Sequence, residues 1–258
     1  MLHELLSAGL SPWVLLPLFL AGMLAGFVDT LAGGGGMLTV PALMAVLPPD
    51  AALATNKLQG SFGTLSATWY FVRRGQIHFR RLWPGMLACA LGAALGAWVV
   101  QLLSPSLLQK GLPLLLMLVA LVFVFMPSLG EVEREARLPF WFFVGSTLFP
   151  LGFYDGFLGP GTGSFLMLAL IALRGYTLQN ATIEAKAYNA TTNLVSLFVF
   201  LAGGRVLWLV GLTMAGGQLL GARLAAGLIL SKGNRLIRPA VIVMSLLMSG
   251  YLAYRFWL

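Results

Sequence analysis

Charged residues are scarce in this chain of 258 residues, of which only 9% are Asp, Glu, Lys or Arg. Hydrophobic residues make up 59% of the chain, and the mean hydropathy is +0.90. A soluble globular domain carries about 25% charged residues. The composition therefore excludes an ordinary soluble domain and predicts a membrane protein with several spans.

Cysteine and histidine are almost absent. The single cysteine, Cys89, excludes an internal disulfide and any CxxC redox or zinc motif. Two histidines, His3 and His78, are too few for a multi-histidine metal centre. The sequence also lacks a nucleotide-binding loop and a recognisable nucleophile motif. We therefore expect no enzyme activity, no cofactor and no bound metal.

Acidic residues are few: the 16 Lys and Arg residues outnumber the 8 Asp and Glu residues, which gives a formal net charge of +8. This excess does not indicate nucleic-acid binding, because the basic residues lie in short loops between apolar runs. In one orientation, ten Lys and Arg residues lie in loops on one side and three on the other. Positive loops face the cytoplasm, so we expect a multi-pass protein of the bacterial inner membrane with both termini outside. Residues 1–12 contain no Lys or Arg, so the first apolar run is predicted to be a helix and not a signal peptide.

Hydropathy divides the chain into ten apolar segments. Most are long enough to cross a hydrocarbon core, which takes about 20 residues. Segments 35–47 and 161–174 would reach only about 20 Å as helices, and both follow glycine-rich stretches. The segments are 12–32, 35–47, 56–73, 82–103, 106–126, 139–158, 161–174, 183–202, 206–230 and 236–257.

Equivalent residues recur half a chain apart. Asp29 and Asp155 are 126 residues apart, and Lys57 and Lys186 are 129 apart. A steady offset of this kind indicates an internal duplication. The sequence thus predicts an all-α protein made of two five-segment repeats.

The duplication defines the domains and their topology. We expect a first transmembrane repeat at 1–127, a charged cytoplasmic linker at 128–138 and a second repeat at 139–258. Five crossings in each half would give the repeats opposite topology, as in many transporters. Parallel repeats would result if the two short segments re-enter the membrane, and the inverted arrangement is favoured.

Two lysines each head a polar stripe within an apolar segment. Lys57 and Lys186 are predicted to begin the third and eighth helices, and a polar stripe avoids lipid by facing protein or water. The alternative is that each lysine snorkels to the membrane surface. Their occurrence at equivalent positions favours a substrate-binding role, together with Ser61, Asn189 and Asn193 from the two stripes.

Three carboxylates are candidates for ion coupling. Asp29 and Asp155 would need partners at membrane depth, because a buried charge costs about 2.5–3.5 kcal/mol. The lysines, or backbone amides freed by the glycine breaks, could provide them. Capping of the following short helices is an equally weighted and compatible role. Glu184, whose counterpart is Thr55, is a weaker candidate for proton handling.

The glycine runs predict helix breaks at bilayer depth. Glycine is a poor helix former, so each run leaves free N–H groups at the start of a short helix, where anions bind. The candidate substrate-binding glycines are Gly34, Gly35, Gly36, Gly161 and Gly163. The pairs Gly92/Gly96 and Gly217/Gly221 are instead typical of close helix packing.

These motifs resemble the sulfite exporter TauE/SafE family of membrane permeases. The resemblance rests on GFVDTLAGGGGMLTVPAL (26–43) with ATNK (54–57), and on GFYDGFLGPGTGSF (152–165) with ATIEAK (181–186). It spans nearly the whole chain. Two departures are the uninterrupted GGGG run and Pro160 in the second copy. The resemblance implies transport of a small, often sulfur-containing anion such as sulfite or sulfoacetate, coupled to protons.

The sequence therefore predicts a secondary transporter that moves a small anion across the lipid bilayer. An anion channel and a non-transporting assembly or scaffold protein are the alternatives. Nucleic acid is not an expected partner. Substrate identity, direction, coupling ion and assembly into a homo-oligomer are left open by the sequence.

Overall fold

The computed structural model describes residues 11–104, 107 and 134–232, and this part of the chain is helical without strands. The first half contains a short 3₁₀ turn at Pro12–Val14 and helices α2 (Leu15–Ala32), α3 (Gly35–Met44), α4 (Pro49–Arg73) and α5 (Phe79–Gln101). The second half contains α7 (Phe140–Phe143), a π-helical stretch (Val144–Leu148), α8 (Phe149–Phe157), α9 (Thr162–Arg174), α10 (Leu178–Ala202) and α11 (Trp208–Lys232).

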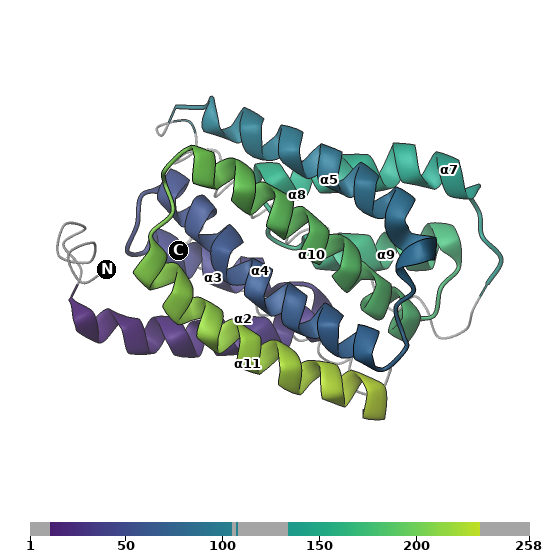
Figure 1. Cartoon of the computed structure of the whole chain (residues 1–258), viewed down its shortest axis with the longest axis horizontal. Helices are drawn as coiled ribbons and strands as arrows, with labels where there is room; N and C mark the ends of the chain where they lie inside the picture. Colours follow the sequence, from purple (N-terminus) through teal and green to yellow (C-terminus); the bar gives the residue numbers. More distant parts are fainter. Residues whose placement is uncertain (1–10, 105–106, 108–133, 233–258) are drawn as a thin grey trace, which may run out of the picture.

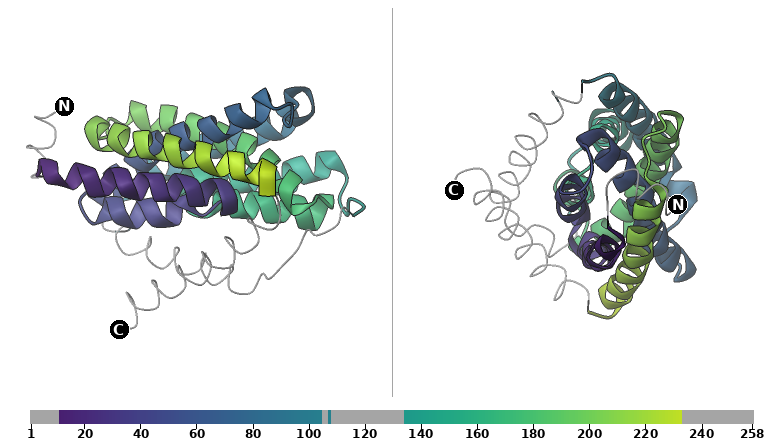
Figure 2. Two further views of the ribbon diagram at one scale, coloured as in Figure 1. Left: turned by 90° about the horizontal axis from the view of Figure 1, so that it is seen from below. Right: turned by 90° about the vertical axis from the view of Figure 1, so that its left-hand side faces the viewer.

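The described helices run along one long axis, with α4 and α10 in the middle (Figure 1). Helix α11 packs against α2 and α4 along one edge, and α5 packs against α8 and α10 along the other. Figure 2 shows the same bundle from below and along its axis. Each half therefore contributes helices to both edges.

Three described helical stretches are long and apolar enough to cross a membrane: Pro12–Ala32, Phe79–Gln101 and Trp208–Lys232. The two predicted short segments are present as the short apolar helices α3 and α9. The all-helical membrane architecture is thus confirmed. The segments 106–126 and 236–257, most of the linker and both chain termini lie outside the described residues.

The sequence analysis placed the starts of two helices too far along the chain. Helix α4 begins at Pro49 and α10 at Leu178, whereas hydropathy placed these starts at 56 and 183. Pro49 follows an extended Pro48 and occupies the first turn, where its missing N–H costs nothing. The Thr177 side chain caps α10 by accepting a hydrogen bond from the Asn180 N–H. Hydropathy misses these turns because Pro49, Asp50 and Asn56 in α4, and Gln179 and Asn180 in α10, lower the local average.

Glycine seams allow the edge helices to approach closely. Side chains added at Gly217 or Gly221 would collide with the backbone of α2, and those added at Gly92 or Gly96 with the backbone of α8. The predicted packing role of these four glycines is confirmed. Each seam joins the first helix of one half to the last described helix of the other.

Contacts also establish the direction of each helix. Gly22 meets Met214 and Gly26 meets Gln218, so α2 and α11 are parallel. Similar contacts make α4 parallel to α11, and make α8 and α10 parallel to α5. Gly60 meets Asn193, and the Thr68 hydroxyl donates to the Lys186 carbonyl, so α4 and α10 are antiparallel. Helices α2, α4 and α11 therefore run one way, and α5, α8 and α10 run the other way.

Candidate functional site

Two helix breaks meet at the centre of the bundle. Helix α2 ends at Gly33, whose φ of 77° is left-handed, and α9 starts after Gly161, whose φ is 81°. Only glycine adopts such angles without strain. A methyl group at Gly163 would lie 2.7 Å from the Gly33 Cα atom, and the Ser164 hydroxyl donates to the Ala32 carbonyl oxygen. The two helix breaks, which are about half a chain apart in the sequence, are therefore in contact.

Lys57 binds the carboxyl group of the second half. Its Nζ atom lies 2.8 Å from Asp155 Oδ1 and also donates to the Asp155 backbone carbonyl. Both residues are only 1% exposed. The lysine therefore neutralises the carboxylate and satisfies a carbonyl near the end of α8, where the helix dipole is negative.

Lys186 makes the reciprocal contact with the first half. Its Nζ atom lies 2.8 Å from Asp29 Oδ2 and donates to the Asp29 carbonyl. Asp29 Oδ1 accepts the Gly35 N–H at 3.2 Å, at the start of α3. The predicted ion pairing and capping thus coincide at Asp29, whereas Asp155 Oδ2 is buried and lacks a hydrogen-bond partner among the described residues.

The lysines do not begin their helices and do not snorkel. Lys57 lies about two turns inside α4, and Lys186 lies equally far inside α10. Both are 1% exposed. The snorkelling alternative is wrong because about two helical turns precede each lysine and place it at the centre of the bundle.

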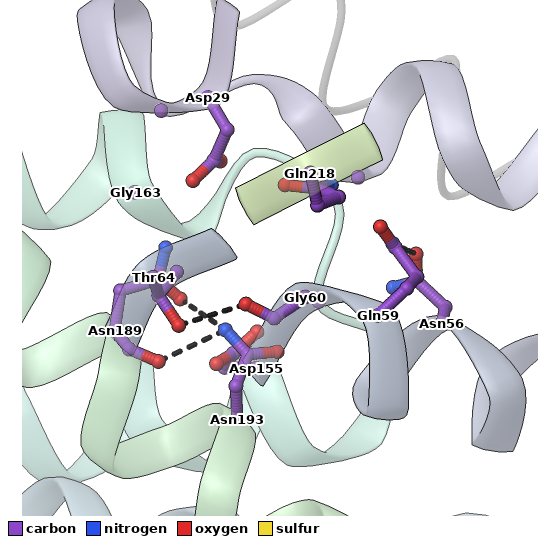
Figure 3. A pocket seen from close by; sticks show the side chains of 13 residues that line it. Asp29, Asn56, Gln59, Gly60, Thr64, Asp155, Gly163, Asn189, Asn193 and Gln218 are labelled. Carbon is purple, nitrogen blue, oxygen red and sulfur yellow. Dashed lines mark hydrogen bonds between the residues drawn. The ribbon is translucent and has the colours of Figure 1, made fainter. Parts of the chain in front are cut away.

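A small polar cavity of about 30 Å³, open on one side, lies beside the two ion pairs. Figure 3 shows side chains from both halves facing it. A cavity of this size has room for one or two water molecules. The lining residues are Asp29, Gly33, Gly36, Asn56, Gln59, Gly60, Thr64, Asp155, Gly159, Gly163, Asn189, Asn193 and Gln218.

The structure brings only part of the predicted site together around this cavity. The predicted residues that line it are Asp29, Gly36, Asp155, Gly163, Asn189 and Asn193. Lys57 and Lys186 lie behind the aspartates, and Ser61 donates to the Lys57 carbonyl. Gly34, Gly35 and Gly161 belong to the helix starts without lining the cavity, and Glu184 lies elsewhere.

Several lining residues were missed by the sequence analysis. Asn56, Gln59 and Gly60 flank Lys57 on α4, and Thr64 was noticed only as part of its polar stripe. Gln218 had a detectable signal, since it is an uncharged polar residue within the apolar helix α11. A buried amide in a membrane helix is energetically unfavourable unless it forms a hydrogen bond with the protein or with a ligand.

The uncharged part of the lining offers hydrogen-bond donors beside Gln59 Oε1, an acceptor that is buried without a partner among the described residues. Asn56 Oδ1 accepts from Thr39 and Gln59, which leaves its Nδ2 group toward the ligand space. Asn189 Oδ1 likewise accepts from Asn193 Nδ2 at 2.8 Å. The N–H groups of Gly36 and Gly163 lie in the first turns of α3 and α9, where a helix provides no partner. These groups can bind an anion without a free cation.

A second polar pocket surrounds Glu184 at one end of the bundle. Glu184 Oε1 lies 3.5 Å from Arg81 Nη2, and the same guanidinium donates to the Tyr176 hydroxyl. Gln76 and Asn180 also line this pocket. Burial and the nearby Glu184 charge raise the pKa of the Tyr176 phenol, so it stays protonated at neutral pH.

A third pocket lies at the opposite end, beside an ion pair between Asp50 and Arg205. Asp50 is in the first turn of α4, and Arg205 precedes α11. The three pockets share no lining residue. Among the described residues, no group of three or more His, Cys, Asp and Glu side chains could hold a metal ion.

The apolar helices, the paired helix breaks and the polar cavity define a helical membrane protein with a polar centre. The family described as Sulfite exporter TauE/SafE matches residues 18–252. The chain therefore belongs to this family, as the motif resemblance predicted.

Similar proteins carry names of the same class. The chain is 46% identical over 248 residues to the probable membrane transporter protein YfcA of Escherichia coli K12, covering 95% of this chain and 91% of that protein. It is 45% identical over 239 residues to a probable membrane transporter protein of Haemophilus influenzae, covering 92% and 93%. A probable membrane transporter protein of Bacillus subtilis, YunE, is 22% identical over 253 residues, covering 88% and 91%. No solved structure matches the chain.

Proposed function

We propose that this protein is a secondary transporter that moves a small, sulfur-containing oxyanion, such as sulfite or sulfoacetate, across the bacterial inner membrane. The observation that carries the proposal is the polar cavity at the meeting of the two helix breaks. Free N–H groups at Gly36 and Gly163 and the Asn189 amide supply donors suited to oxyanion oxygens. The proposal is of transport and not of catalysis.

We infer that the two halves are inverted repeats, 1–127 and 139–258, joined by the 128–138 linker. The directions of the described helices support this arrangement, because α2 opposes α8, α4 opposes α10 and α5 opposes α11. Inverted repeats with broken helices near the midplane are a recurrent transporter architecture.

The lysines hold the aspartates in place in this proposal and do not bind the anion directly while paired. Each pair is electrically neutral, so the site attracts an anion through oriented amides. Asp155, with an unpartnered Oδ2 facing a polar cavity, is the first candidate to accept the coupling proton. Asp29 would act with it, and Glu184 would exchange protons at one end of the bundle.

The separation of the three pockets supports alternating access over a channel. A channel needs a continuous polar path, whereas a transporter needs a central site that is closed from at least one side. The end that carries Arg73, Arg74, Arg80, Arg81 and Arg174 would face the cytoplasm. Assembly into homo-oligomers stays a prediction of the sequence.

The test is uptake by purified protein in proteoliposomes with an imposed pH gradient. We expect saturable flux of sulfite or sulfoacetate that depends on the gradient and shows counterflow. Asp155→Asn should abolish the dependence on the gradient, and Arg205→Gln, at an exposed ion pair, is the matched control with active transport. Linear, non-saturable flux would indicate a channel, and absence of flux for every anion tested would contradict the proposal.

A further inference from the structure

We infer that Gln218 contacts the transported anion and sets its orientation and selectivity, through a cavity whose two halves differ chemically. This inference rests on the proposed transport function. Gln218 is 3% exposed and lines the cavity from α11 (Figure 3). Its side chain makes no hydrogen bond with any residue that the structure describes.

A buried amide without a partner normally destabilises a protein. Leaving a buried donor or acceptor unsatisfied costs about 1–3 kcal/mol, and the Gln218 amide borders the polar cavity. Helix α11 is otherwise apolar around this position, and the same backbone site packs against Gly26. An apolar residue could serve the packing equally well. A ligand that bonds to the amide explains why a glutamine stands there.

The repeat provides an internal comparison. Cys89 lies 129 positions before Gln218 and occupies the equivalent place, since Gly152 packs on the Cys89 backbone as Gly26 packs on that of Gln218. Cys89 does not line the cavity, and its thiol lies 3.4 Å from the Leu148 carbonyl oxygen. The polar side chain is thus present in one half only.

Other positions of the lining also differ between the halves. Gly60 and Thr64 on α4 correspond to Asn189 and Asn193 on α10, and Asn56 and Gln59 on α4 correspond to Ala185 and Tyr188, at the offset of 129. The cavity therefore presents amides of α4, α10 and α11 at positions where the two repeats do not match. A symmetric scaffold with an asymmetric lining holds an anion in one preferred orientation, which distinguishes anions by shape.

Gly63 provides the space for this side chain. A methyl group at Gly63 would collide with Gln218 Oε1 and would lie 3.3 Å from its Cβ atom. The collision is with the far end of a flexible side chain, so Gly63→Ala would displace the amide while leaving the backbone in place.

The test compares Gln218→Leu with Cys89→Ala in proteoliposomes, using sulfite, thiosulfate, sulfoacetate and acetate as the transported anions. Gln218→Leu should raise the KM of the preferred anion about tenfold to a hundredfold, the loss expected for one hydrogen bond to a charged ligand. It should also change the ranking of the four anions. Cys89→Ala should leave both unchanged.

Two further variants keep the inference testable if Gln218→Leu does not fold. Gly63→Ala should raise the KM, and it should add no further change in a Gln218→Ala background. Wild-type flux with an unchanged KM and ranking in every Gln218 and Gly63 variant would overturn the inference alone. Absence of wild-type flux would instead overturn the proposed transport function.

Discussion

The two Lys–Asp pairs join the halves in the interior of the bundle. Each lysine comes from one half and its aspartate from the other. Removing one partner of a buried pair is far more destabilising than removing both, because a lone charge remains in a low-dielectric site. The pairs therefore stabilise the contact between the halves.

Lys57→Met should lower the free energy of unfolding by about 3–5 kcal/mol, because Asp155 loses its neutralising partner. The double variant Lys57→Met/Asp155→Asn should regain most of that loss. Thermal unfolding of the detergent-purified variants measures both effects. A double variant as unstable as Lys57→Met would show that the ion pair is not the cause. Arg205→Gln provides the control, since exposed pairs contribute only about 0–1 kcal/mol.

The residue identities at the centre were partly predictable from the sequence. Asp29, Asp155, Lys57 and Lys186 were identifiable because charges at membrane depth need partners. The pairing of each lysine with the aspartate of the other half was not predictable, because it depends on how the two helix breaks pack against each other. Gln218 stands out locally as a polar residue in an apolar helix, but its position beside Gly63 of α4 depends on the α4–α11 contact and was not predictable.

At the scale of elements, the glycine seams decide how the edge helices pack. Small residues let backbones approach and gain dispersion contacts where no hydrophobic effect drives association. Adjacent glycines on α11 differ in this respect. An added methyl at Gly217 would collide with the Phe19 carbonyl oxygen, whereas one at Gly216 would lie 3.5 Å from the Phe19 ring.

Gly217→Ala should therefore destabilise the protein by about 1–3 kcal/mol, the usual cost of overpacking. Gly216→Ala should leave stability unchanged or slightly raise it, since alanine is the better helix former. Thermal unfolding in a single detergent compares the two. Equal stability of the two variants would contradict a close α2–α11 seam.

The elements themselves were largely predictable, and the misses have one cause. The short helices α3 and α9 followed from the glycine breaks. The early starts of α4 and α10 were missed because hydropathy ignores turns that are polar yet capped, as by Thr177. Polar turns can lie inside a membrane protein when they face its interior.

At the scale of the whole molecule, most of the described arginines lie at one end of the bundle. Hydrogen bonds hold Arg134 and Arg137 against the end of α9, close to Arg174. Arg73, the last residue of α4, also lies at this end, because α4 ends where its antiparallel neighbour α10 begins. Arg205 lies at the opposite end, next to Asp50 at the start of α4.

Reporter fusions test the resulting orientation. A fluorescent protein fused after Gln76 should fold and fluoresce in the cytoplasm, whereas alkaline phosphatase fused after Gly204 should be active outside. The equivalent loops of the two repeats would then lie on opposite sides, as inversion requires. Activity of the same reporter at both positions would support parallel repeats with re-entrant short helices.

The exchange of partners between the halves has a consequence for the origin of the gene. A polypeptide with one half alone would carry a buried lysine without its aspartate and a first helix without the helix that covers it. Two copies of such a half-length ancestor, inserted in opposite directions, would satisfy each other. On the inverted arrangement, the present chain would be a fusion of two such copies. Fusion would allow the sequences of the two halves to diverge, as at the equivalent positions Gln218 and Cys89.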